Sequence, residues 1–153
     1  MKREDEKLLL KDLCARLPYG VKCLVNYTFC NETTDYEDVK ASDVDTLITI
    51  NQELESYFFE KLSQWFDVDE FKPYLLPLSS MTLEQRCKVQ SLLPDKCTIS
   101  FTNSKFEFYG EDYHEIKLEQ FEKIFNLFNM WHVDYRGLIP KGLAIDVTEL
   151  NIY

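Results

Sequence analysis

The sequence predicts one α+β domain over residues 1–153, with a candidate subdivision near residues 78–82. A chain of 153 residues fits a single domain. Short segments with strand character follow one another along the chain, which favours antiparallel pairing over a doubly wound parallel sheet. Helical periodicity appears near both ends and in the middle. The 4 glycines and 5 prolines make long flexible linkers unexpected.

The first predicted element is an N-terminal helix over residues 4–17. A stripe with the 3.6-residue period is expected to face the core, and Pro18 and Gly20 end the helix. The stripe consists of Leu10, Leu13, Cys14 and Leu17, widened by Leu9.

Short strands are predicted next, over residues 21–29 and 47–50. In the first strand Val21, Cys23, Val25 and Tyr27 share one face. The polar, acidic residues 31–43 between the strands read as a loop. Residues 54–66 fit a helical stripe and an aromatic-rich strand equally well.

An extended segment and a capped middle helix follow. Each proline in residues 71–77 disfavours helix at the residue before it. Thr82 and Gln85 have the spacing of a capping box, which predicts a helix from there to about Leu93, ended by Pro94.

The last elements are a β-hairpin and a C-terminal amphipathic helix. Residues 97–101 and 105–109 alternate apolar and polar side chains around a short polar turn. The final helix is expected over residues 118–131. Its buried face should carry Phe121, Ile124, Phe125, Phe128 and Trp131.

Composition points to a cytoplasmic protein of a reducing compartment. The chain has 5 cysteines without a CxxC pair, which are expected to be buried free thiols. We expect no membrane segment, because no apolar run approaches the roughly 20 residues that a spanning helix needs. Phosphate-loop and dinucleotide motifs are absent, and 2 histidines give no metal-binding pattern, so no cofactor or metal is predicted.

The negative charge is concentrated in one segment. The net charge is −10, and residues 32–70 hold twelve acidic residues against Lys40 and Lys61. This field disfavours direct nucleic-acid binding and attracts a basic protein partner. A solvated surface kept for solubility is the plainer interpretation. The candidate acidic contact surface is Asp35, Glu37, Asp38, Asp43 and Asp45.

The densest group of functional side chains follows the last helix, at His132, Asp134, Tyr135 and Arg136. It reads either as a small polar binding site or as a helix-ending turn stitched by an Asp134–Arg136 pair, with Tyr135 on the core. A cationic imidazole is favoured at a helix C-terminus, and Gly137 can supply a positive φ.

Three stretches together resemble a family of small uncharacterised proteins encoded in gut-bacterial genomes and their phages or other mobile elements. They are LLLKDLCARLPYGV (residues 8–21), KPYLLPLSSMT (72–82) and DYRGLI with KGLA (134–139 and 141–144). The resemblance covers most of the chain and favours strand for residues 57–66. The sequence departs from the family at Leu76, where the family frequently has a basic residue, and in the high acidity of residues 31–70. The family brings no known activity, so what it implies is an accessory role.

The function expected from these observations is that of a non-enzymatic interaction or regulatory accessory protein, which contacts a basic partner through an acidic surface. One alternative is a nucleic-acid mimic that inhibits a DNA-binding enzyme. Another is an enzyme with an unfamiliar site around His132–Arg136, which would require these side chains to converge on a pocket.

Overall fold

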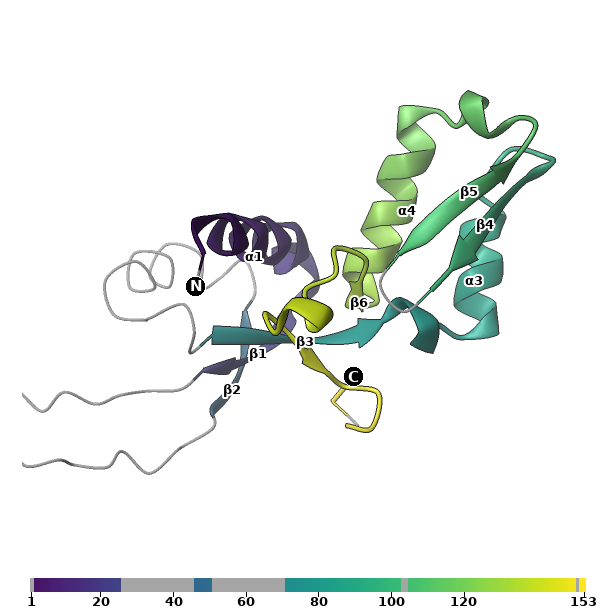
Figure 1. Ribbon diagram of the computed structural model, residues 1–153. Coiled ribbons are helices and arrows are strands. Elements are labelled where there is room, and N and C mark those ends of the chain that lie inside the picture. The colour runs from purple at the N-terminus through teal and green to yellow at the C-terminus, as the bar shows by residue number, and fades with distance from the viewer. Residues whose placement is uncertain (1, 26–45, 51–70, 103–104, 151) are drawn as a thin grey trace, which may run out of the picture.

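A computed structural model describes residues 2–25, 46–50, 71–102, 105–150 and 152–153. It confirms the α+β class, with α-helices and two sheets (Figure 1). The predicted loop at 31–43 and the ambiguous segment at 54–66 lie outside the described residues.

The larger sheet has the strand order β2-β1-β3-β6, and β7 also pairs with β3. β1 (Val21–Val25) is antiparallel to both β2 (Thr46–Ile50) and β3 (Phe71–Pro77). The short strands β6 (Val133–Asp134) and β7 (Ile145–Asp146) are parallel to β3. The expected antiparallel sheet is therefore joined by two parallel pairings from the C-terminal part of the chain.

Helix α1 (Arg3–Arg16) packs on this sheet, but with a different face from the expected one. Leu9 and Leu13 are buried, together with the charged pair Asp12 and Arg16. Leu10 is half exposed and Cys14 is exposed, so their assignment to the core stripe was wrong. A short 3-10 turn, η1 (Leu17–Tyr19), leads into β1.

The second group of elements lies beyond the end of β3 (Figure 1). After η4 (Leu78–Ser80) come α3 (Leu83–Gln90), β4 (Cys97–Phe101), β5 (Phe106–Gly110), η5 (Tyr113–Glu115) and α4 (Leu118–Met130). The capping box at Thr82 and Gln85 is confirmed, as is the β4–β5 hairpin. η6 (Ile139–Lys141) lies between β6 and β7.

Two hydrophobic clusters form the core, one on each side of the junction between β3 and η4. The first contains Leu9, Leu13 and Val21, and the second contains Val89, Ile124 and Phe128. The subdivision near residues 78–82 stays a prediction. β3 nevertheless runs from one group of elements to the other (Figure 1).

The cysteines do not share one environment. Cys23 and Cys97 are buried, whereas Cys14 and Cys87 are exposed. The expectation of buried thiols was therefore wrong for two of the positions that the structure describes. Burial raises the pKa of the Cys23 thiol well above its ordinary value, so this thiol stays protonated and inert.

Candidate functional site

The predicted site at His132–Arg136 lies after α4, in the segment that contains β6. The four side chains do not converge on one cavity. Asp134 supports the following turn, Tyr135 and Arg136 join a charged cluster with α1, and His132 packs against the C-terminal tyrosine.

Asp134 is almost fully buried, and its carboxylate stabilises the turn after β6. Oδ1 accepts a hydrogen bond from the Leu138 amide at 2.9 Å, and Oδ2 accepts one from the Ile139 amide at 2.8 Å. Gly137 has φ +70° there, as expected from its sequence position. The predicted Asp134–Arg136 pair was wrong, because Arg136 binds the Asp12 carboxylate instead.

Arg136 pairs instead with Asp12, with 2.8 Å between Nη1 and Oδ1. The same carboxylate holds Arg16 in a bidentate contact, at 2.7 Å to Nε and 3.0 Å to Nη2. Arg16 Nη2 also donates to the Val133 carbonyl at 2.9 Å. Asp12 and Arg16 are fully buried, so this ion pair replaces the hydration that burial removes.

Tyr135 lies between the two arginines. The guanidinium carbons of Arg16 and Arg136 are 5.8 and 4.6 Å from its ring centroid. Its hydroxyl donates to Asn129 Oδ1 at 3.1 Å, and its ring packs against Phe125 and Phe128. Burial raises the pKa of the Tyr135 hydroxyl. These contacts anchor the strand to α4 and leave the hydroxyl engaged.

His132 has φ +54° and is buried. Its ring stacks on that of Tyr153, with 4.1 Å between centroids, and its Nδ1 has no hydrogen-bond partner among the described residues. Burial, together with the positive charges of Arg16 and Lys22, lowers the pKa of His132 to about 4. The expected cationic imidazole was wrong, because desolvation outweighs the helix C-terminus.

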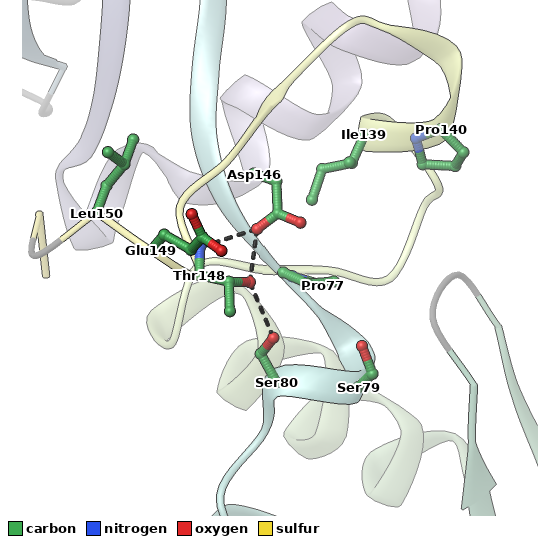
Figure 2. Close-up of a pocket in the computed structure, with 9 residues that line it drawn as sticks. All are labelled: Pro77, Ser79, Ser80, Ile139, Pro140, Asp146, Thr148, Glu149 and Leu150. Atoms are coloured by element: carbon green, nitrogen blue, oxygen red, sulfur yellow. Dashed lines mark hydrogen bonds between the residues drawn. The ribbon is translucent and has the colours of Figure 1, made fainter.

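A groove that sequence reasoning missed lies between the end of β3, η6 and the segment after β7 (Figure 2). It has a volume of about 790 Å³. Its lining residues are Pro77, Ser79, Ser80, Ile139, Pro140, Asp146, Thr148, Glu149 and Leu150. They come from three separate parts of the chain, so no local motif marks the groove.

A chain of hydrogen bonds crosses this groove. The Thr148 amide and hydroxyl donate to Asp146 Oδ1 at 2.8 and 2.6 Å, and the Ser80 hydroxyl lies 3.0 Å from that of Thr148 (Figure 2). Asp146 and Glu149 are its charged lining residues, and both are acidic. The groove therefore offers carboxylates and hydroxyls beside the apolar side chains of Ile139 and Pro140.

Other predicted features lie elsewhere. The acidic residues Asp35, Glu37, Asp38, Asp43 and Asp45 are outside the described residues. Within the part that is described, no three His, Cys, Asp or Glu side chains are grouped to hold a metal ion. Over the same residues, no helix has the length and apolar character needed to cross a membrane.

Comparisons with family models, with curated proteins and with solved structures each gave no match to this chain.

Proposed function

We propose that this protein is a non-enzymatic accessory protein that binds a basic protein partner. The groove of Figure 2 carries the proposal. Asp146 and Glu149 give it negative charge, and none of the described residues in its lining is cationic. A lysine or arginine side chain of a partner could place its cation near these carboxylates and its methylene stem against Ile139 and Pro140.

The overall charge supports the same proposal. The net charge of −10 steers basic proteins toward the surface and opposes the approach of nucleic acid. The resemblance to proteins of bacterial genomes and mobile elements favours a regulatory or inhibitory role over core metabolism. The arrangement around His132–Arg136 gives no support to an enzyme, because Asp134, Tyr135 and Arg136 are engaged in turn, packing and ion-pair contacts and the four side chains do not converge on a cavity.

The test is an affinity capture from lysate of the source cells with the tagged full chain, at low and at high salt, with identification by mass spectrometry. We expect a basic partner that is retained at low salt and released at high salt, because salt screens exposed charges. Asp146→Asn with Glu149→Gln should weaken capture. Reversing the charges at Asp35, Glu37 and Asp38 tests the acidic segment separately.

The matched control replaces two exposed carboxylates outside the groove, Glu115→Gln with Glu122→Gln, and should capture the partner normally. Capture of a DNA-binding enzyme that duplex DNA displaces would favour the mimic form of the proposal. Absence of a basic partner at either salt concentration, or equal capture by the groove variant and the native chain, would contradict the proposal.

A further inference from the structure

The β4–β5 hairpin is a two-stranded sheet, and the outer edge of β4 faces α3. In the hairpin, Thr102 donates to the Lys105 carbonyl at 2.8 Å, and Ser100 lies opposite Glu107. Hydrogen-bonded and non-hydrogen-bonded positions alternate along an antiparallel pair. The backbone groups of Ile99 and Phe101 therefore turn away from β5, toward α3.

Gln90, at the end of α3, already occupies part of this edge. Its Nε2 donates to the Cys97 carbonyl at 2.6 Å, and its Oε1 accepts from the Ile99 amide at 3.2 Å. One carboxamide thus supplies a donor and an acceptor to β4, as the main chain of an adjoining strand would. The edge therefore bonds a group with the chemistry of a peptide.

The next acceptor and donor along the same edge are the Ile99 carbonyl and the Phe101 amide. Neither has a partner among the hydrogen bonds of the described residues. They border a groove of about 400 Å³ between α3 and β4. The groove is lined by Arg86, Cys87, Gln90, Ile99, Ser100 and Phe101. The groove therefore lies beside two backbone groups that have no hydrogen-bond partner in the described part of the chain, next to Gln90.

Arg86 sets the charge of this groove. Its Nε donates to the Met81 carbonyl at 3.1 Å and its Nη2 to the Ser79 carbonyl at 2.8 Å, which fixes the side chain. Its guanidinium carbon lies 5.8 Å from the Phe101 ring centroid. Nη1 keeps its donors open within the described part of the chain. Arg86 is the charged residue of the lining, so the groove favours a carboxylate.

We propose that the groove between α3 and β4 binds an extended acidic segment of a partner protein as an added strand. The segment pairs with the Ile99 carbonyl and the Phe101 amide, and one of its carboxylates binds Arg86. This mode of recognition takes affinity from main-chain hydrogen bonds and selectivity from side chains. This groove shares no lining residue with the groove near Asp146 and prefers the opposite charge, so the two proposals are tested by different variants and fail independently.

The first test is a titration of the full chain with short, capped, fluorescent peptides, followed by anisotropy and by amide chemical shifts. The probe alternates valine and glutamate. One comparison peptide has lysine in place of glutamate, and another has a methylated backbone that cannot pair with a strand edge. We expect the acidic peptide to bind, with each comparison peptide weaker by about tenfold or more. The Ile99 and Phe101 amide signals should shift with the acidic peptide.

Two exposed thiols provide a matched pair of variants. Cys87→Glu places a negative charge in the groove and should weaken binding of the acidic peptide. Cys14→Glu adds the same charge on α1 and should leave binding unchanged. Arg86→Gln should remove the preference for glutamate over lysine, with circular dichroism as the check that the variant is folded.

Several outcomes would overturn the proposal. They are no binding of the acidic peptide into the millimolar range, equal binding of all peptides, equal effects of the two cysteine variants, or binding that leaves the Ile99 and Phe101 amide signals in place.

Discussion

At the residue scale, the buried imidazole of His132 makes the stability of the fold depend on pH. It is buried against Tyr153, and its backbone has φ +54°. Tyr153 is itself held, because its hydroxyl donates to the Tyr74 carbonyl at 2.9 Å and accepts from the Lys22 amide at 3.1 Å. Burial raises the pKa of Tyr153 to about 12. Both rings are therefore neutral at physiological pH.

This arrangement predicts a loss of stability between pH 6.5 and pH 4. The folded-state pKa of His132 is about 4, below the unfolded value of about 6.5. The unfolded chain therefore binds the proton first, and the contribution present above pH 6.5 is lost as the pH falls toward 4. At pH 5 the free energy of unfolding should be lower by about 2 kcal/mol from this group alone.

The measurement is urea unfolding at several pH values, with the native chain compared with His132→Asn. Asparagine tolerates a positive φ better than most residues and does not titrate in this range. The control is His114→Asn, which replaces an exposed histidine and retains His132, and it should keep the pH profile of the native chain. Parallel profiles for the native chain and His132→Asn would rule out the neutral buried imidazole as the cause.

At the element scale, the end of β5 depends on one glycine. Gly110 has φ +129°, and a Cβ atom there would lie 2.1 Å from the Lys96 carbonyl oxygen. This contact is with backbone, so β5 or the turn before β4 would have to move. Gly142 also has a positive φ, of +72°, but a Cβ atom there would meet no described atom within 4 Å.

We expect the same glycine-to-alanine substitution to lower the free energy of unfolding by different amounts at these two positions. Gly142→Ala should lower the free energy of unfolding by about 1 kcal/mol, from backbone strain alone. Gly110→Ala should lower it by on the order of 3 kcal/mol, because steric overlap adds to the strain. Chemical denaturation of both variants measures this. Equal losses would show that the hairpin end relaxes around an added methyl group.

Most elements could be predicted from the sequence because their signals are local. Thr82 and Gln85 carry the capping box within one turn of α3, and α4 has a clear amphipathic period. The strands β6 and β7 are only two residues long, and their partner β3 lies far away in the chain, so no alternation marks them.

Neither the buried face of α1 nor the ion-pair partner of Arg136 could be predicted from the sequence. Asp12 and Arg16 are charged, so a hydrophobic stripe drawn through the helix avoids them. Both are nevertheless fully buried, because each compensates the charge of the other. The Val133 carbonyl that Arg16 also binds lies more than a hundred residues away along the chain, as does the Asp12 carboxylate from Arg136. Pairing over that distance depends on the tertiary fold, which local spacing does not report.

At the scale of the whole molecule, the buried ion pair of Asp12 and Arg16 links the two hydrophobic clusters. Asp12 and Arg16 belong to α1, which packs with the first cluster, while Val133 and Phe128 belong to the second. Arg16 donates to the carbonyls of both of these residues. Disruption of the ion pair should therefore affect both parts of the core.

Asp12→Asn is expected to destabilise the protein by about 3–5 kcal/mol, because it leaves the buried Arg16 charge uncompensated. Hydrogen exchange should become faster in α1 and in α4 together. The control is Glu119→Gln, which breaks an exposed ion pair with Lys123 at the same i,i+4 spacing and should change little. Faster exchange in α1 alone would show that the two clusters unfold separately.

The Gln90 carboxamide also limits self-association of this protein at high concentration. A bare strand edge is a template on which identical chains can stack into fibrous aggregates. Gln90 occupies the Cys97 and Ile99 end of the β4 edge, so among the described residues the part near Phe101 is left without a hydrogen-bond partner. A chain that lost this glutamine would present a longer edge to its neighbours and would be more prone to aggregate in storage.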